Sequence, residues 1–464
     1  MAIDAILEKA LDHEPLTRAE AYEIYDNAPL QLLCSVADTL RRQAVDDPTV
    51  VTWQIDRNVN ITNVCKSGCR FCNFHCKPHE EDKAYITTMA EYRQKIDEAL
   101  RLGADQLLLQ GGMHPRLGID FYETLFRQIK SEYPQLRLNA LGAPEVSHIA
   151  TISNLTTTEV LERLHRAGLD TLPGAGAEIL SDDVRKRISP AKPSARDWVR
   201  VMHEAHKMGI PTTATMMYGH IETPHQRVDH LITIRDLQAL KPEKSRGFTA
   251  FIPWVFCPKG TQLEKEGISP RFSATEYLRI IAMSRIVLHN IRNIQASWLT
   301  VGKEVAEIAL KSGANDMGSI MIEENVVSSA GATTRFDREA MQGYIKEDKS
   351  LFDPAAVVSG TDVAMNRAIE IFSQSGDAAH YRIASALKGC YPTIYGLGDW
   401  LRFVESPPVT EIPLAAEIEA LHTYWGYRMD DRWVVPPLYD DCISQGDNKV
   451  MLILGEQSRI VPRR

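Results

Sequence analysis

The fold class is indicated by DQLLLQGGMHPRLGIDFYETLFRQIKSEYPQLRLNALG, residues 105–142. A short apolar run closed by two glycines predicts a buried strand over residues 105–112. Large apolar residues recur at every fourth position from Leu117, which predicts a helix over 117–133. A second apolar run predicts a strand over 136–142. A strand, a helix and a strand in this order form a parallel pair with the helix covering one face.

The same alternation continues on both sides of this unit. Further strands are predicted at 50–65, 169–176, 211–219, 247–256, 294–300 and 314–316. Helices are predicted between them at 156–168, 194–209, 223–240, 273–290 and 302–313. About eight β/α units over roughly 50–320 predict an α/β fold, a (β/α)8 barrel of the TIM type. In such barrels the active site lies at the carboxyl ends of the strands.

The barrel is expected to lie between two other segments. Residues 1–48 are predicted to be helical, and Thr17 with Glu20 fits a capping box at the start of one helix. We therefore divide the chain into an N-terminal helical segment at 1–48, a barrel at 49–350 and a C-terminal α+β extension at 351–464. A strand is predicted near 450–454 in the extension, for which the sequence indicates no role.

Composition excludes several classes of protein. The chain has 464 residues, of which 44% are hydrophobic and 24% charged, which is typical of a globular protein and not of a disordered one. No apolar run approaches the ~18 residues that a membrane span needs. The first residues lack the pattern of a secretory signal. A net charge of −9 without any Lys/Arg-rich block argues against a nucleic-acid partner.

The strongest chemical signal is a cluster of cysteines after the first predicted strand. Cys65, Cys69 and Cys72 have the spacing C-x3-C-x2-C. In a large chain without a secretory signal, such a cluster predicts a metal site rather than a disulfide framework. Thiolates hold iron–sulfur clusters, and three of them leave one iron of a 4Fe–4S cube open to a substrate or cofactor.

A zinc site is the alternative interpretation of the same cysteines. Cys76 lies four residues after Cys72, and His75 and His79 flank it, so these residues could form a zinc knuckle. The protein would then be a zinc-stabilised binding protein rather than an enzyme. The two interpretations differ in colour, since an iron–sulfur protein is brown and zinc is colourless.

The cysteine spacing, with the aromatic Phe71 before the third cysteine, resembles the radical S-adenosylmethionine (radical SAM) superfamily. Four longer segments resemble, more narrowly, the dehypoxanthine futalosine cyclase family, also called cyclic dehypoxanthine futalosine synthases, of menaquinone biosynthesis. They are LLLQGGMHPRLGIDFYETLFR (107–127), LPGAGAEILSDDVRKRISPAKPS (172–194), TTATMMYGHIETPHQRVDHL (212–231) and GANDMGSIMIEENVVSSAGA (313–332). The FO synthase subunits and aminofutalosine synthase are sibling enzymes and remain alternatives.

The resemblance implies a specific reaction. A 4Fe–4S cluster and S-adenosyl-L-methionine would generate a 5′-deoxyadenosyl radical that takes the hydrogen at the ribose 4′ carbon of dehypoxanthine futalosine. The sugar radical would close onto the benzoate ring, and loss of one electron and one proton would restore aromaticity. Such a cyclase belongs to the oxidoreductases. The implied electron donor is a flavodoxin or ferredoxin, and an oxygen-sensitive cluster implies a cytoplasmic enzyme.

The resemblance also assigns cofactor-binding roles. Cys65, Cys69 and Cys72 would ligate the cluster, with Phe71 shielding it. Gly111 and Gly112 would approach the methionine part of the cofactor, Glu178 its ribose hydroxyls and Lys192 its carboxylate. The alternatives without a cofactor role are a tight turn for the glycines, an exposed start of a helix for Glu178 and a solvated surface position for Lys192.

Candidate catalytic residues lie near the ends of two later strands. Asp316, Glu323 and Glu324 are candidate bases for the proton that leaves during rearomatisation. His220, close to Glu222, follows the strand at 211–219. A carboxylate at the start of a helix and a hydrogen-bonded loop histidine are the alternatives. Arg335, or instead Arg338 or Lys192, would meet the substrate benzoate.

Overall fold

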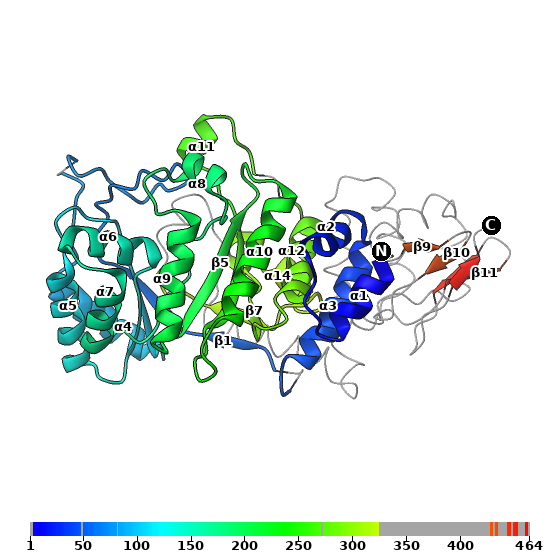
Figure 1. Ribbon diagram of the computed structural model, residues 1–464, viewed down its shortest axis with the longest axis horizontal. Helices are drawn as coiled ribbons and strands as arrows, with labels where there is room; N and C mark the ends of the chain where they lie inside the picture. The colour runs from blue at the N-terminus through cyan, green and yellow to red at the C-terminus, as the bar shows by residue number, and fades with distance from the viewer. Residues whose placement is uncertain are drawn as a thin grey trace.

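The computed structural model describes residues 3–47, 50–80, 82–270 and 272–323, and the backbone of five short strands between 427 and 462. The N-terminal segment forms three helices beside the barrel, shown in dark blue in Figure 1. They are α1 (Ile3–Leu11), α2 (Arg18–Asn27) and α3 (Leu30–Gln43). The predicted capping box is present at α2, where the Glu20 amide donates to Thr17 Oγ1 and the Thr17 amide donates to the Glu20 carboxylate.

Parallel strands form the centre of the molecule. The first barrel strand is made of β1 (Thr52–Gln54) and β2 (Asp56–Asn60). The others are β3 (Gln106–Gln110), β4 (Arg137–Ala140), β5 (Thr212–Tyr218), β6 (Phe248–Val255), β7 (Asn293–Ile294) and β8 (Asp316–Ser319). The order is β2-β3-β4 in one sheet, β5-β6-β7 in another and β1-β8 in a third, and every pair is parallel.

Single bridges join these sheets into a ring. Thr171 and Leu172 take the fourth position, since Thr171 pairs with β4 and Leu172 with β5. Gln295, just after β7, pairs with Asp316 of β8. The ring closes where the Ile322 amide donates to the Asp56 carbonyl at 3.0 Å. The α/β barrel predicted from the alternating pattern is therefore confirmed.

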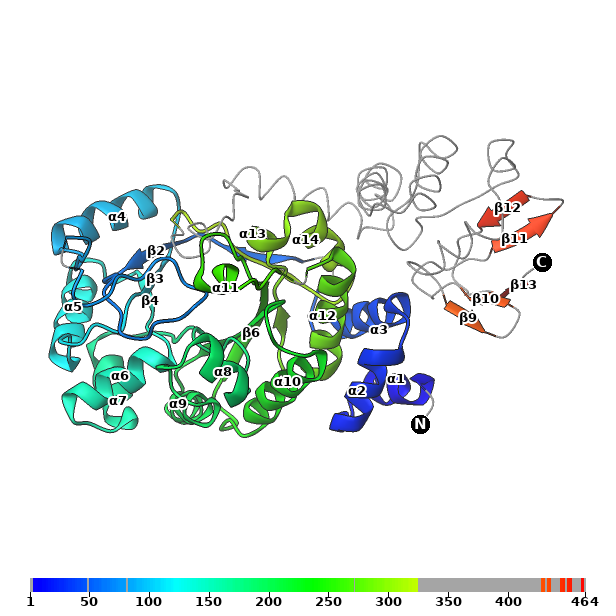
Figure 2. The ribbon, with the colours of Figure 1, turned by 90° about the horizontal axis from the view of Figure 1, so that it is seen from above.

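Helices surround the strands, as the view in Figure 2 shows. They are α4 (Met89–Arg101), α5 (Ile119–Glu132), α6 (Ala143–Ser153), α7 (Thr157–Ala167), α8 (Asp182–Ile188), α9 (Ala195–Lys207), α10 (Pro224–Ala239), α11 (Gln262–Lys265), α12 (Ala274–Val287), α13 (Trp298–Val301) and α14 (Lys303–Ala309). Helices α4, α6, α8 and α11 were not predicted from the sequence, and α13 lies where a strand was predicted. For α4 a signal was available, because Thr88 and Glu91 form a capping box and Tyr92 and Ile96 bury one face.

Two predicted strands are much shorter than expected. The segment 169–176 contributes only a bridge on each side, because the chain leaves the sheet at Pro173 and Gly174. The segment 294–300 turns into α13 after β7. There the Ser297 hydroxyl donates to the Pro253 carbonyl and its amide donates to the Tyr277 hydroxyl, which diverts the chain from the strand direction.

The C-terminal extension is described only as backbone strands. They are β9 (Tyr427–Met429), β10 (Arg432–Val434), β11 (Ile443–Gly446), β12 (Lys449–Leu452) and β13 (Ile460–Pro462). The strand predicted near 450–454 corresponds to β12, which pairs with β11 in an antiparallel ladder. The predicted boundary at 350 lies outside the described residues. Within the described part of the chain, no helix has both the length and the apolar character of a membrane span.

Candidate active site at the carboxyl ends of the strands

A cavity of about 380 Å3 opens inside the barrel. On the first barrel strand, four polar residues at alternate positions line it, and we call them the strand ladder: Gln54, Asp56, Asn58 and Asn60. Alternate residues of a strand point to one face, so this spacing places all four in the lumen. The intervening Arg57 faces outward and forms ion pairs with Glu98 of α4 and with Glu323.

The cysteine loop forms another part of the cavity lining. Cys65, Cys69 and Cys72 all line the cavity, together with Phe71. The Ser67 hydroxyl lies between two of the thiols, 2.9 Å from Cys65 Sγ and 3.3 Å from Cys69 Sγ. Backbone hydrogen bonds fix the loop, since the Arg70 amide donates to the Ile188 carbonyl at 2.8 Å. The structure thus brings the three predicted ligands to one cavity.

Cys76 is placed differently from these three cysteines. It is buried, but it does not line the cavity. Its amide donates to the Asn63 carbonyl and its carbonyl accepts from the Cys65 amide, so it pairs with the segment that leads into the loop. Among the described residues, no three His, Cys, Asp or Glu side chains converge as ligands of a single metal ion would.

The glycine pair after β3 has a packing reason of its own. A Cβ added at Gly112 would lie 2.1 Å from the Val64 carbonyl oxygen, and one at Gly111 would lie 3.1 Å from the Thr62 backbone. Both glycines line the cavity. The missing side chains let the segment before the first cysteine cross directly over the end of β3, which positions the cysteine loop.

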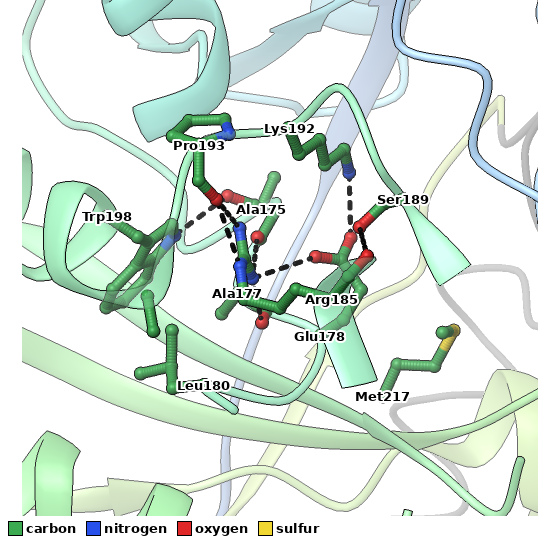
Figure 3. A network of polar contacts seen from close by, with 12 residues as sticks. Ala175, Ala177, Glu178, Leu180, Arg185, Ser189, Lys192, Pro193, Trp198 and Met217 are labelled. Atoms are coloured by element: carbon green, nitrogen blue, oxygen red, sulfur yellow. Dashed lines mark hydrogen bonds and ion pairs between the residues drawn. The ribbon is translucent and has the colours of Figure 1, made fainter. Parts of the chain in front are cut away.

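Glu178 and Lys192 form a buried ion pair beside the cysteines (Figure 3). Lys192 Nζ donates to Glu178 Oε1 at 2.8 Å and lies 5.3 Å from the centre of the Phe71 ring. Burial alone would lower the pKa of the Lys192 ammonium, but Cys69 and Glu178 outweigh burial and raise it. Lys192 therefore stays charged in the cavity, and neither residue occupies the exposed surface position of the alternative interpretation.

Arg185 supports this ion pair, and our sequence analysis missed it. Its guanidinium donates to the carbonyls of Gly176, Ala177 and Pro193, and it is 2% exposed (Figure 3). These bonds hold the loop in which Glu178 adopts a φ of +40°, a left-handed conformation that is uncommon for a residue with a side chain. The RKR run at 185–187 is typical of a solvent-exposed charged surface, so nothing in the sequence indicated that Arg185 is buried.

Glu178 keeps one oxygen available. Its Oε2 is buried without a hydrogen-bond partner among the described residues, 3.7 Å from Arg185 Nη1. A buried carboxylate oxygen without a donor is costly, so it marks a place where a ligand hydroxyl would be stabilised. Three thiols, a free carboxylate oxygen and an ammonium group thus share one wall of the cavity. We call it the cofactor wall: Cys65, Cys69, Cys72, Glu178 and Lys192.

Three of the predicted catalytic residues do not line the cavity. Asp316, at the start of β8, accepts hydrogen bonds from the Thr52 hydroxyl and the Gly318 amide. Glu323 is held by Arg57 and Lys95. His220 contacts the Met217 carbonyl and Glu222 beneath the end of β5. His220 is the hydrogen-bonded loop histidine of the alternative interpretation, whereas Asp316 lies in a strand and Glu323 in ion pairs rather than at the start of a helix. The structure does not bring these three residues to the site. Glu324, Arg335 and Arg338 lie outside the described residues.

Other lining residues went unnoticed at the level of sequence. An apolar wall faces the lumen and consists of Phe74, Leu108, Ile252, Trp254, Leu299 and Met321. Asp56 is the residue of the strand ladder that can carry charge. Its signal was visible in QIDRNVN, residues 54–60, where polar residues alternate on a predicted strand. Polar residues at alternate positions usually mark the solvent-exposed face of a strand. Here that face lines the lumen because the sheet closes into a barrel.

Comparisons with known proteins match the chain in two segments. The radical SAM superfamily profile matches residues 59–234, and the CofH/MqnC C-terminal region matches 245–356. The cyclic dehypoxanthine futalosine synthase of Streptomyces coelicolor is 42% identical over 72% of this chain and 83% of its own length. That of Halalkalibacterium halodurans is 39% identical over 75% and 91%.

A second activity appears among the relatives at similar identity. The 5-amino-6-(D-ribitylamino)uracil–L-tyrosine 4-hydroxyphenyl transferase of Methanothermobacter thermautotrophicus is 42% identical over 71% of this chain and 88% of its own length. Two solved structures share the fold. Methylornithine synthase PylB has a TM-score of 0.56 at 18% identity, covering 75% of this chain and 96% of its own. The FeFe-hydrogenase maturase HydG of Carboxydothermus hydrogenoformans has 0.58 at 16%, covering 90% and 93%.

Proposed function

Because the chain belongs to the radical SAM family that contains the cyclic dehypoxanthine futalosine synthases and the CofH-type tyrosine transferases, we propose that it cyclises dehypoxanthine futalosine in menaquinone biosynthesis. The family assignment confirms the resemblance inferred from the cysteine spacing. The similarity to two bacterial cyclic dehypoxanthine futalosine synthases over most of their length is the observation that carries the proposal. The reaction would make this chain an oxidoreductase.

The cofactors of this superfamily are a 4Fe–4S cluster and S-adenosyl-L-methionine. The cofactor wall fits both of them: the three cysteines would hold the cluster, the free Glu178 oxygen would accept from ribose hydroxyls, and Lys192 would pair with the methionine carboxylate. When bound, the two cofactors supply a 5′-deoxyadenosyl radical that takes hydrogen from an unactivated carbon. Phe71, packed against Lys192, would keep water from this side of the cavity.

The remaining lining residues would bind and orient the substrate. The apolar wall suits a benzoate ring, to which Trp254 and Met321 offer contact area. The amides of Asn58, Asn60 and Asn139 would meet the ribose hydroxyls. A ring and a sugar held together in a closed barrel react as one molecule, which is the main contribution that positioning makes to such a step.

The second candidate is transfer of a 4-hydroxyphenyl group, as in the archaeal relatives. It is favoured by their comparable identity and by a C-terminal family region that covers both kinds of enzyme. Aminofutalosine synthase and the other FO synthase subunit are further siblings. In every case the electron donor would be a flavodoxin or ferredoxin, and we propose a cytoplasmic location without a nucleic-acid partner.

The test is a substrate comparison. The full chain is reconstituted anaerobically with iron and sulfide, reduced, and given S-adenosylmethionine with either dehypoxanthine futalosine or tyrosine plus 5-amino-6-(D-ribitylamino)uracil. We expect a product two mass units lighter than dehypoxanthine futalosine, and no adduct from the second pair. An adduct in the second reaction alone would replace the cyclase by the transferase. A colourless protein that makes no 5′-deoxyadenosine would revive the zinc interpretation.

A further inference from the structure

Three carboxylates line the cavity in the described part of the chain, and they differ in their partners. Glu178 is paired with Lys192. Glu145 accepts a hydrogen bond from the Gly142 amide, and burial raises the pKa of its carboxyl although the charge of Lys192 and this hydrogen bond act in the opposite direction. Asp56 belongs to the strand ladder instead. Its contacts in the described residues include no cation, and it is 3% exposed.

The hydrogen bonds of Ser319 determine which oxygen of the Asp56 carboxylate can accept a proton. Ser319 Oγ accepts from two amides, those of Asp56 at 3.2 Å and Met321 at 2.9 Å. Its single hydrogen is therefore left for Asp56 Oδ1, with which it forms a short hydrogen bond. Asp56 Oδ1 is thus held as an acceptor. Among the described residues, Asp56 Oδ2 meets the side-chain amides of Gln54 and Gln106, each at a long 3.4 Å.

The charged surroundings of Asp56 suit a group that takes up a proton near neutral pH. Burial raises the pKa of the Asp56 carboxyl to about 6, the bonds from Ser319 and Gln106 lower it, and Asp105 raises it. Asp105 is itself paired with Arg137 at 2.8 Å. Neighbouring Arg57 points to the outer face and pairs with Glu98 and Glu323, so it does not neutralise Asp56. A general base is most effective when its pKa lies near the working pH.

We infer that Asp56 is the general base of ring closure, accepting through Oδ2 the proton that leaves the substrate ring. The inference rests on the proposed function, and it gives Asp56 the role that the sequence assigned to Asp316, Glu323 or Glu324. The geometry carries it: Asp56 is a buried carboxylate in the lumen, oriented by Ser319, and no cation in the described part of the chain pairs with it.

The chemistry of this step balances. The ribose radical carbon bonds to a ring carbon, which leaves one unpaired electron in the ring. The C–H bond at that carbon then breaks, its proton goes to Asp56 Oδ2, and its electron pair restores the aromatic ring. The surplus electron leaves to a one-electron acceptor of the iron–sulfur or flavin class. Together with the hydrogen atom taken from the ribose, the substrate has lost two hydrogens.

The first test compares two isosteric variants of the reconstituted full chain. Asp56→Asn is expected to form substrate-dependent 5′-deoxyadenosine within about threefold of wild type, while the lighter product falls by roughly 100-fold or more. Asp316→Asn is the matched control. Asp316 is half-buried and, like Asp56, has a pKa that desolvation raises to about 6, but it does not line the cavity. We expect its product yield within about threefold of wild type.

The second test follows the pH dependence. In the wild type, the ratio of product to 5′-deoxyadenosine should rise with pH around a midpoint near 6, because the base must be ionised. Ser319→Ala removes a hydrogen bond that stabilises the carboxylate, so its midpoint should move upward by about half a unit to one unit. A difference infrared titration, wild type minus Asp56→Asn without substrate, should show one carboxyl band with the same midpoint near 6.

The outcomes separate a failure of Asp56 as the base from a failure of the proposed function. If the wild type makes the lighter product and Asp56→Asn makes it with the same yield per 5′-deoxyadenosine, Asp56 is not the base although the cyclase function stands. If the wild type makes no lighter product, the function fails, and the inference fails with it. If Asp56→Asn makes no 5′-deoxyadenosine at all, the Ser319→Ala profile decides, and an unmoved midpoint overturns the inference.

Discussion

The cofactor wall and the strand ladder line the same cavity but are built in opposite ways. The cofactor wall comes from loops and contains the ion pair of Lys192 with Glu178, whose backbone is left-handed. The buried Arg185 supports this pair from behind. The strand ladder comes from regular alternation on one strand, and three of its four residues are neutral amides. A charged cofactor needs fixed compensating charges. A reactive radical needs a closed site that excludes water, which the sheet provides while holding one carboxylate, Asp56, among neutral amides.

The largest effect should come from removing a cluster ligand. Cys65→Ala in the cofactor wall is expected to lose most of its iron and the brown absorption, and to lower 5′-deoxyadenosine formation by roughly 1,000-fold or more. Cys76→Ala is the matched control, because Cys76 is buried close by without lining the cavity. It should keep both iron and activity. Equal loss of iron in the two variants would mean that Cys76 is also a ligand, as the zinc interpretation requires.

The second effect concerns the backbone that positions the cysteine loop. Gly112→Ala places a Cβ 2.1 Å from the Val64 carbonyl oxygen, and we expect it to lower the free energy of unfolding by about 3 kcal/mol. Gly209→Ala is the control for backbone strain alone, since Gly209 has a φ of +76° and open space around it. Its cost should be about 1 kcal/mol. Denaturant unfolding measures the free energy of unfolding of both variants. An equal loss in the two would contradict the packing role of Gly112.

The third effect isolates the ion pair of the cofactor wall. Lys192→Met leaves the buried Glu178 carboxylate without its ammonium partner and removes the cation expected to meet the methionine carboxylate. Affinity for S-adenosylmethionine, measured by equilibrium binding to the reconstituted chain, should fall roughly 100-fold. Lys186→Met alters an exposed lysine of the same segment and should change affinity less than about twofold. Wild-type affinity in Lys192→Met would remove Lys192 from the cofactor site.

The smallest effect should come from the substrate side of the cavity. Trp254→Ala deletes part of the apolar wall, so KM for dehypoxanthine futalosine should rise by roughly 10-fold, while slow cleavage of S-adenosylmethionine without substrate stays unchanged. Trp254→Phe should recover most of the affinity. If cleavage without substrate fell as far as the turnover, Trp254 would belong to the cofactor side, and the division of the cavity would be wrong.

The sequence predicted the regular half of the molecule more completely than the irregular half. Strands β3, β4, β5 and β6 and most covering helices follow from apolar periodicity, which reports burial of a face. The strands near 169–176 and 294–300 were overpredicted because Pro173 and the hydrogen bonds of Ser297 end them. Those bonds join residues far apart in the chain, so no local pattern contains them.

For the site, the residues that could be predicted were those that lie in recognisable motifs. The three cysteines were predictable because their spacing is itself the motif, and Glu178 and Lys192 because they lie in segments that resemble known relatives. Asp316, Glu323 and His220 were chosen for their position near strand ends, but each already has partners that hold it elsewhere. Asp56 was missed because its place in the lumen depends on β8 closing the barrel over it.

The most direct test of the account uses dehypoxanthine futalosine with deuterium at the ribose 4′ carbon. The reconstituted wild-type chain is reduced anaerobically in the presence of S-adenosylmethionine, and the masses of both products are measured by mass spectrometry. The account predicts 5′-deoxyadenosine one mass unit heavier, formed together with a cyclic product that has lost the label. Unlabelled 5′-deoxyadenosine, or labelled 5′-deoxyadenosine without any cyclic product, would contradict it.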